Sequence, residues 1–279
     1  MRAMLLGLPI MAVTVSIAAA VLTPLKIGPE EVFGPNPELD EPTQSWLPTV
    51  KIAKPVGWKN GEAPAVAPGL SVVEFAADLD HPRWLYVLPN GGVLVAETNR
   101  PPNEAGGGIK AWATSFFMGK AGAGVQSPNR ITLLTDTDGD GKADKRSVLL
   151  ENLMSPFGMA LVGDKLYVAN ADAVVRFPYK EGDEKITAPA ESVAALPGGP
   201  RNHHWTKNII AARDGSRLYA AIGSNSNVGE NGLAEEEGRA AIWEISLPHG
   251  KARSFATGLR NPVGMDFKPG SDELWTVVN

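Results

Sequence analysis

The feature that most limits how this chain can fold is an internal repeat of four similar hairpins. Each repeat begins with a polar or proline residue and continues through an apolar strand and a turn of Gly, Asp or Asn. Each then ends in a second strand of apolar and small residues, which is the pattern of a β-hairpin. The hairpins occupy residues 81–97, 155–170, 202–223 and 261–279. Equivalent leucines recur at intervals of 52 to 72 residues, at Leu94, Leu166, Leu218 and Leu274.

Further strands are expected between the hairpins, at residues 173–179, 192–196, 240–247 and 252–257. Four strands in roughly 50 residues are typical of a β-propeller blade. We therefore predict an all-β fold, a β-propeller of four-stranded antiparallel blades over residues 70–279, with negligible helix outside the amino-terminal segment. About four blades are expected. The alternatives are a closed four-bladed propeller and part of a longer one, and we favour the latter because the apolar run 274–278 would otherwise leave an unpaired strand edge.

Composition agrees with a turn-rich β protein and excludes several kinds of function. The chain has 30 Gly and 23 Pro, and 43% of its residues are hydrophobic. A net charge of -5 argues against a nucleic-acid partner, whose phosphates require a basic face. Cysteine is absent from the sequence, which excludes disulfides, thiolate metal ligands and a cysteine nucleophile.

The amino terminus indicates export. Residues 1–25 contain Arg2 and then an uncharged apolar run that ends before Lys26. A cleaved signal peptide with a small-residue site at residues 18–20 and a retained membrane anchor over residues 3–25 are both open. Either places the bulk of the chain in the periplasm, since Arg2 favours the cytoplasmic side. Residues 26–69 are rich in Pro, Gly and acidic residues, and we expect them to form a linker.

Two adjacent histidines precede the first strand of the third hairpin. His203 and His204 lie ahead of that strand, and the small polar loop 224–227 follows the strand paired with it. Because both ends of a hairpin meet at one edge, imidazole and amide groups converge there, as a site for an oxygenated small molecule requires. The alternative is that a histidine lies at the surface of a strand end and that the Asn/Ser loop is only a turn.

An acidic stretch, TDTDGDGKAD, lies within residues 135–145 and is the most specific local motif. Its alternating carboxylates surround Gly141 at the point where a calcium loop turns sharply. Position twelve of such a loop is Ser147, where an acidic residue is expected, and the flanking segments favour strands over helices. We predict a structural calcium site outside an EF-hand, with a solvated acidic turn as the alternative. The predicted ligands are Asp136, Asp138, Asp140 and Asp144.

Four motifs carry a family resemblance: NHHW, IGSNSNVGENG, EEEGRAAIWEI and TGLRNPVGMDF. Through them, residues 70–279 resemble the sorbosone dehydrogenase branch of the soluble pyrroloquinoline-quinone (PQQ) dependent glucose/sorbosone dehydrogenases. These are six-bladed propellers that oxidise sugars and aldehydes outside the cytoplasm. The resemblance implies PQQ and calcium as cofactors, a sugar or sugar-derived aldehyde as substrate, and an external electron acceptor that is a quinone or a cytochrome.

The resemblance also implies roles for particular residues. His204 matches the catalytic base, while His203 stands where glucose-oxidising relatives have Asp. Arg260 would stabilise negative charge on a quinone oxygen, and Asn261 would orient the cofactor. Further cofactor contacts are expected from His203, Asn225 and Asn227.

Part of the family's site is expected outside this sequence. The ligands of the calcium ion that bridges cofactor and protein would follow Asn279. We therefore expect the 279-residue chain alone to lack quinone-dependent activity and a longer form to have it. The alternative function is a non-enzymatic propeller that presents its loops to a protein or a glycan. Convergence of His204, Arg260 and the 224–227 loop on one face would favour the enzyme.

Overall fold

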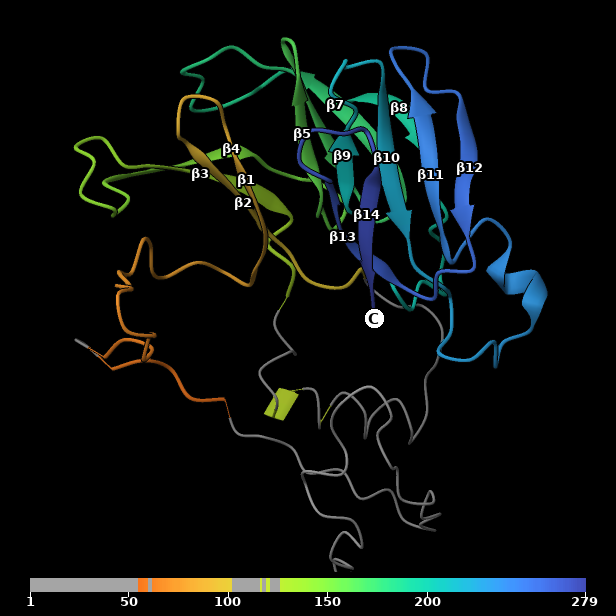
Figure 1. Ribbon diagram of the computed structural model, residues 1–279, viewed down its shortest axis with the longest axis horizontal. Coiled ribbons are helices and arrows are strands. Elements are labelled where there is room, and N and C mark those ends of the chain that lie inside the picture. The colour runs from red at the N-terminus through yellow and green to blue at the C-terminus, as the bar shows by residue number, and fades with distance from the viewer. Residues whose placement is uncertain (1–54, 60–61, 102–115, 117–118, 121–125) are drawn as a thin grey trace, which may run out of the picture. The chain divides into compact units, whose positions relative to one another are not determined.

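The computed structural model describes residues 55–59, 62–101, 116, 119–120 and 126–279 (Figure 1). The chain divides into two units, Met1–Lys51 and Ile52–Asn279, and the first lies outside the described residues. The predictions of a signal or anchor at 1–25 and of the first part of the linker fall on this undescribed segment. None of the helical residues in the described part of the chain belongs to a helix long and apolar enough to cross a membrane.

The described residues contain fourteen β-strands in four antiparallel sheets (Figure 1). The first sheet consists of β1 (Pro82–Val87), β2 (Val93–Glu97), β3 (Arg130–Thr135) and β4 (Lys145–Leu150). The second consists of β5 (Met159–Val162), β6 (Lys165–Ala169), β7 (Ala173–Pro178) and β8 (Glu191–Ala195). The third consists of β9 (Ile209–Ala211), β10 (Arg217–Ile222), β11 (Ala241–Ser246) and β12 (Ala252–Thr257). The fourth pairs β13 (Pro262–Phe267) with β14 (Leu274–Val278).

This arrangement confirms the predicted all-β class and four-stranded antiparallel blades. In each four-stranded sheet the strands pair in chain order, and each predicted hairpin is the first strand pair of its sheet. Helix in the described part of the chain is limited to the 3-10 helix η2 (Leu233–Glu236) and to residues 116 and 119–120. The acidic segment connects β3 to β4, and the additional length of the first repeat interval lies between β2 and β3, at residues 98–129.

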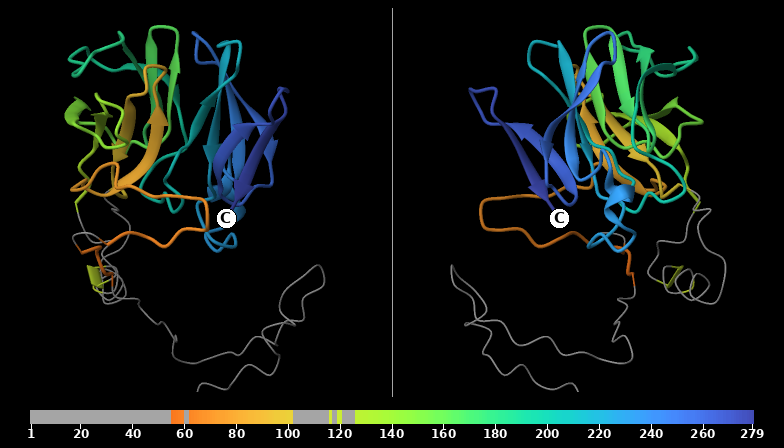
Figure 2. Two further views of the ribbon diagram at one scale, coloured as in Figure 1. Left: turned by 60° about the vertical axis from the view of Figure 1, so that its left-hand side comes forward. Right: turned by 90° about the vertical axis from the view of Figure 1, so that its right-hand side faces the viewer.

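Consecutive sheets stack face to face because both faces of their strands are apolar (Figure 2). On β6, Leu166 and Val168 belong to the core shared with the first blade. The alternate residues Tyr167 and Ala169 belong to the core shared with the third blade. Since side chains alternate across a strand, a continuous apolar run fills two cores at once.

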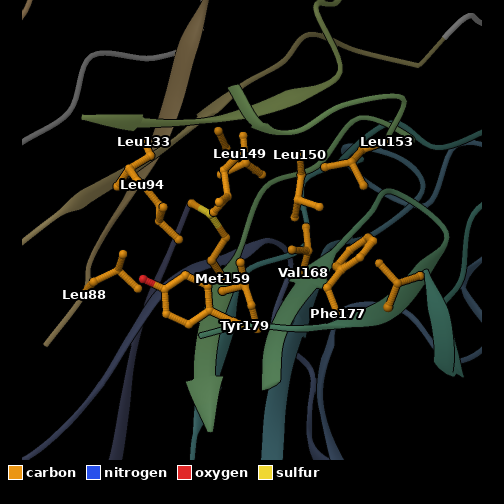
Figure 3. Close-up of a cluster of buried hydrophobic side chains, with 14 residues drawn as sticks. Leu88, Leu94, Leu133, Leu149, Leu150, Leu153, Met159, Val168, Phe177 and Tyr179 are labelled. Atoms are coloured by element: carbon orange, nitrogen blue, oxygen red, sulfur yellow. The ribbon is translucent and has the colours of Figure 1, made fainter. Parts of the chain in front are cut away.

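The core between the first two blades shows how they are held together. Leucines of β2, β3 and β4 face Met159, Val168 and Phe177 of the second blade (Figure 3). Leu94 is completely buried and Met159 is 1% exposed. Truncating one such side chain to alanine typically costs about 2–5 kcal/mol, so this packing fixes the blades against each other.

The first strands of successive blades lie against one another, with β5 in contact with β1 and β9, and β9 in contact with β13. Gly158, just before β5, permits this approach, because an added Cβ would lie only 2.4 Å from the backbone nitrogen of Ile209. In every hairpin the residues before the first strand adjoin those after the second strand. Segments from several blades therefore meet at one end of the strands, and we call this the His204 end because the predicted histidine lies there.

Candidate functional site

His204 lies in a turn ahead of β9, and its ring contacts Ser224, the second residue after β10. The ring Nδ1 is 2.8 Å from the carbonyl oxygen of Ser224 and 3.0 Å from its hydroxyl oxygen. The hydroxyl donates its own hydrogen to the carbonyl of Ser226 at 2.7 Å, so both oxygens accept from the ring. The proton of the neutral imidazole is therefore on Nδ1, and the Nε2 lone pair is left to accept a proton.

The surroundings of His204 favour its neutral form. Burial lowers the pKa of His204; the bond to Ser224 and the carboxylate of Glu236 oppose this, while the neighbouring His203 and the guanidinium of Arg260 lower the pKa further. The ring of His203 lies 4.7 Å from that of His204 in an edge-to-face arrangement and is itself exposed. At neutral pH, His204 is thus an uncharged base held in one tautomer.

Arg260 joins this histidine to the loop that follows β10. Its carbonyl accepts a hydrogen bond from the backbone nitrogen of Ser224 at 2.7 Å. Its guanidinium donates to both oxygens of Asn227, at 2.9 Å to the carbonyl and 2.5 Å to the side chain. A third bond, of 2.9 Å, reaches the carbonyl of Asn279. A fixed positive charge is therefore held beside the neutral imidazole.

Two buried asparagine side chains lie in the same region and retain unused acceptors. Asn225 and Asn261 are 4% and 6% exposed, and the side-chain oxygen of each is buried without a hydrogen-bond donor among the described residues. Gly223 lets Asn261 and His204 approach, because an added Cβ would lie 2.4 Å from the Asn261 oxygen and 2.5 Å from the Cβ of His204. A buried acceptor without a donor is costly, so these oxygens are suited to a ligand donor or a hard cation.

Two carboxylates shape the loop after β10. Glu236, delivered by η2, accepts the backbone N–H of Asn225 at 2.6 Å and bonds the hydroxyl of Ser226. Glu230 accepts the backbone N–H groups of Val228 at 2.9 Å and of Asn227 at 3.1 Å. These backbone bonds lower the pKa of Glu230 to about 2. The loop that carries Asn225 and Asn227 is therefore fixed by its own acidic residues.

The structure thus brings together the residues that the sequence predicted for the cofactor and the chemistry. They converge at the His204 end, and the list is His203, His204, Asn225, Asn227, Arg260 and Asn261. These residues lie together at one end of the strands, and their roles in catalysis and cofactor binding stay predictions.

The acidic loop is a separate feature between β3 and β4. Carboxylate oxygens of Asp136, Asp138 and Asp144 lie within 4.8 Å of one another, as a shared cation would require, whereas Asp140 is not in this group. Each carboxylate also accepts local backbone N–H groups. Bonds from the backbone and hydroxyl of Thr137 lower the pKa of Asp144. Ser147, at position twelve, is part of β4.

A cavity of about 800 Å³ lies away from these groups. It is lined by the β1–β2 and β5–β6 turns and by the connection from β7 to β8, at the opposite end of the strands. It contains none of the predicted site residues. Its charged residues are not buried, and it contains none of the buried asparagine oxygens that lack a hydrogen-bond donor. The chemistry is therefore better assigned to the His204 end.

Sequence reasoning missed several groups that build the site. Glu236 lies within a motif that carries the resemblance, but its contact with Asn225 depends on the fold. The loop that contains Ser224 is expected beside the histidines, whereas the two bonds that fix the His204 ring are not. Lys207 follows the histidines in the sequence and is completely buried. The sequence does indicate it in one way, because Lys207 stands immediately before an apolar run, and a charged side chain in a buried segment requires hydrogen-bond partners.

Comparison with known proteins places this site in a family. The TrAA12-like family matches residues 120–279, which is more than half of the chain. The chain belongs to the TrAA12-like family. The match includes the second to fourth sheets, all of the predicted catalytic and cofactor-binding residues, and the acidic loop.

Two solved proteins share the fold. The iodide and calcium structures of Trichoderma reesei Carbohydrate-Active Enzymes Family AA12 give TM-scores of 0.59 and 0.57 at 18% and 19% identity, covering 78% of this chain and 50% of that one. The holo form of the pyranose dehydrogenase PQQ domain from Coprinopsis cinerea gives 0.54 at 19% identity, covering 72% and 44%. The four sheets therefore have the architecture of a PQQ-domain propeller.

One sequence relative is an uncharacterized protein of Borreliella burgdorferi, 28% identical over 144 residues. The match covers 48% of this chain and 36% of that protein. The chain thus spans about a third to a half of the length of the proteins it matches.

Proposed function

We propose that the protein containing this chain is a PQQ-dependent dehydrogenase that oxidises a sugar or a sugar-derived aldehyde of the sorbosone or aldose type. The observation that carries the proposal is the state of His204, a neutral imidazole with Nε2 unprotonated beside a fixed guanidinium. A non-enzymatic binding surface would have no need for a tautomer set by two oxygens. The family and the shared fold support the same reading.

The residues present fit the cofactors in chemical type. Arg260 offers forked donors to anionic or quinone oxygens, which lysine could not match. The unpaired side-chain oxygens of Asn225 and Asn261 suit a donor group or calcium, which prefers oxygen ligands. Gly223 keeps space between Asn261 and His204 free of a side chain. We propose that these residues hold PQQ and calcium, together with His203 and Asn227.

In the proposed reaction, His204 accepts at Nε2 the hydroxyl proton of a sugar, or of the hydrate that a sugar aldehyde forms with water. The resulting imidazolium is stabilised because its Nδ1–H already donates to Ser224. Arg260 stabilises negative charge that develops near it. PQQ, when bound, supplies the two-electron oxidant that takes the hydrogen and its electrons from the substrate carbon.

The setting of the reaction is also a proposal. Arg2 and the apolar run that follows it support export to the periplasm, with a cleaved signal peptide and an inner-membrane anchor over residues 3–25 as the two alternatives. An external electron acceptor, a quinone or a cytochrome, would reoxidise the cofactor. The acidic overall charge supports the absence of a nucleic-acid partner.

The test compares the two adjacent histidines in the natural protein that contains this chain. The protein is reconstituted with PQQ and calcium, and dye reduction is measured with a panel of aldoses and sugar aldehydes. His204→Gln should lower turnover about 10²–10⁴-fold while PQQ binding is retained, because only the base is lost. His203→Gln removes a proposed cofactor contact and should weaken PQQ binding, but at saturating PQQ its turnover should stay within about tenfold of the wild type, since its exposed ring is not the base.

Three results would contradict the proposal. One is the absence of dye reduction with every sugar and aldehyde although PQQ binds. Another is equal turnover in the His204→Gln protein and the wild type. The third is the absence of PQQ binding, which would favour a propeller that presents its loops to a protein or a glycan.

A further inference from the structure

Lys207 lies three residues after His204 and immediately before the buried residues that open β9. Its side chain is completely buried, with 0% exposure. Lysine is almost never buried this fully unless an acidic partner accompanies it. In the described part of the chain, no carboxylate forms an ion pair with Lys207. The role of this charge must therefore come from its other contacts.

All three hydrogen bonds of the Lys207 ammonium go to one short segment. It donates to the carbonyl oxygens of His204 at 3.3 Å and Trp205 at 3.2 Å, and to the side-chain oxygen of Asn202 at 3.3 Å. This segment has no strand or helix, so its carbonyl groups have no ladder partners. A single ammonium thus uses its three N–H donors to hold the segment in a compact loop.

A second cation, in the connection between η2 and β11, contacts the same segment. Arg239, 8% exposed, donates to the side chain of Asn202 at 3.0 Å and to the carbonyl of Gly198 at 2.6 Å. Burial, and to a smaller extent repulsion from Arg239, lowers the pKa of Lys207 to about 7, against a raising effect of Asp172. Burying two cations here is costly, and an apolar side chain would fill the space at lower cost. The benefit of the lysine therefore lies in where it holds the chain.

The other side of the segment is held by aromatic packing. The ring of Trp205 lies 6.2 Å from that of Phe157 in an edge-to-face arrangement, with the guanidinium of Arg83 5.4 Å above the indole. Trp205 is 7% exposed. The segment is thus held by the packing of the Trp205 side chain on one face and by the bonds from Lys207 to its carbonyl oxygens on the other. The His204 ring lies between these two attachments and reaches Ser224.

We infer that Lys207 is a positioning residue, which fixes the backbone from Asn202 to Trp205 and so holds the His204 ring in hydrogen-bonding contact with Ser224. Lys207 touches no reacting group and acts through His204. The inference rests on the proposed function only in taking His204 as the base, because the geometry that Lys207 maintains is a property of the protein without ligands.

The experiment observes His204 directly. The chain contains four histidines, so ¹⁵N labelling of the imidazoles gives few signals, and His204→Gln identifies the relevant one. In Lys207→Met, the His204 signal should lose the pattern of the Nδ1-protonated tautomer. Its titration midpoint should rise toward the ordinary value of 6.5, because burial of the ring is released. Lys165→Met, at a half-exposed lysine of β6, is the matched control and should leave the signal unchanged.

A conservative variant and a second deletion make the test decisive. Lys207→Arg, which keeps a buried donor, should restore part of the His204 signal. Asn202→Ala removes one of the three acceptors and should give the same change in smaller size, and this variant decides the matter if Lys207→Met does not fold. In the natural protein, Lys207→Met should lower kcat with little change in KM, since the base is displaced and the substrate contacts remain.

The inference is overturned if a folded Lys207→Met protein, or failing that Asn202→Ala, keeps the tautomer and titration midpoint of His204. Because this readout needs neither cofactor nor substrate, it separates the role of Lys207 from the proposed activity. A displaced His204 in a protein without dehydrogenase activity would support the positioning role and contradict the function.

Discussion

The His204 end and the acidic loop between β3 and β4 are both polar, but they are built in opposite ways. In the acidic loop, Asp136 and Asp144 accept N–H groups from residues within seven positions along the chain. At the His204 end, the ring of His204 bonds a residue 20 positions away, and Arg260 bonds Asn227, which is 33 positions away. One feature is local and mostly exposed, whereas the other is assembled across strands and combines buried, half-buried and exposed residues.

This difference shows that a motif that is easily recognised in the sequence need not be the functional site, which can be assembled from segments far apart in the chain. The acidic loop is the most specific motif in the sequence, yet its carboxylates are exposed, apart from the half-buried Asp136, and already accept backbone N–H groups of the turn. The His204 end has weaker local signals but a fixed tautomer, a held cation and unused buried acceptors. Chemistry is expected where groups are buried and fixed by the fold, because desolvation strengthens their electrostatic effects.

After the loss of the base in His204→Gln, the largest expected effect comes from breaking the connection that Arg260 makes between segments. Arg260→Ala should lower turnover of the PQQ-loaded natural protein about 10²–10³-fold and weaken PQQ retention, because it removes the donors for developing charge. Dye reduction and equilibrium dialysis of PQQ measure the two effects. Arg253→Ala is the control, since that exposed arginine pairs with Glu244 in the same blade. Equal behaviour of the two variants would remove the distinction between this end and an ordinary surface.

A smaller effect is expected from filling the space between His204 and Asn261. Gly223→Ala should lower the free energy of unfolding by about 1–3 kcal/mol, because the added Cβ would overlap both neighbours. Denaturant unfolding measures this loss. Gly57→Ala should change stability by less than about 0.5 kcal/mol, since no atom lies within 4 Å of the added carbon. If Gly223→Ala is as stable as Gly57→Ala, the close approach at this end is not a constraint.

The fold was largely predictable from the sequence, and the site was predictable only in part. The hairpins and the strands between them follow from apolar runs and turn residues, which are local properties. The convergence of His204 with the loop at 224–227 follows because the two ends of a hairpin must meet. The partners of Arg260 and the buried charge of Lys207 depend on how separate segments pack, which no local pattern specifies.

The pH dependence of stability tests the buried lysine by another route. The pKa of Lys207 falls from an ordinary 10.5 to about 7 on folding, so between these values the unfolded chain binds more protons. The free energy of unfolding should therefore rise with pH from about 7 to about 10.5, by at most about 1.4 kcal/mol per pH unit from this group. Denaturant unfolding of the wild type and Lys207→Met across this range measures it. If the two curves of unfolding free energy against pH are parallel, Lys207 does not contribute this pH dependence, and a lowered pKa of its buried ammonium is contradicted.

The smallest expected effect is on the local feature. Calcium should bind the acidic loop with a Kd of roughly 10⁻⁴–10⁻³ M and raise the melting temperature slightly at millimolar concentration. Calorimetry and thermal unfolding measure this. Asp138→Ala should abolish the effect, whereas Asp140→Ala should reduce it less, because Asp140 is outside the converging group. A calcium response that persists in Asp138→Ala would place the ion elsewhere.

The most direct test of the central claim is a titration of the ¹⁵N-histidine-labelled protein with PQQ in the presence of calcium. The claim is that the ligand binds at the His204 end, so the signals of His204 and His203 should move. His249, in the β11–β12 turn, is the internal control and should not move. Before addition, His204 should show the Nδ1-protonated tautomer and a midpoint below 6.5. Movement of His249 alone, or an unshifted His204 with PQQ bound, would contradict the account.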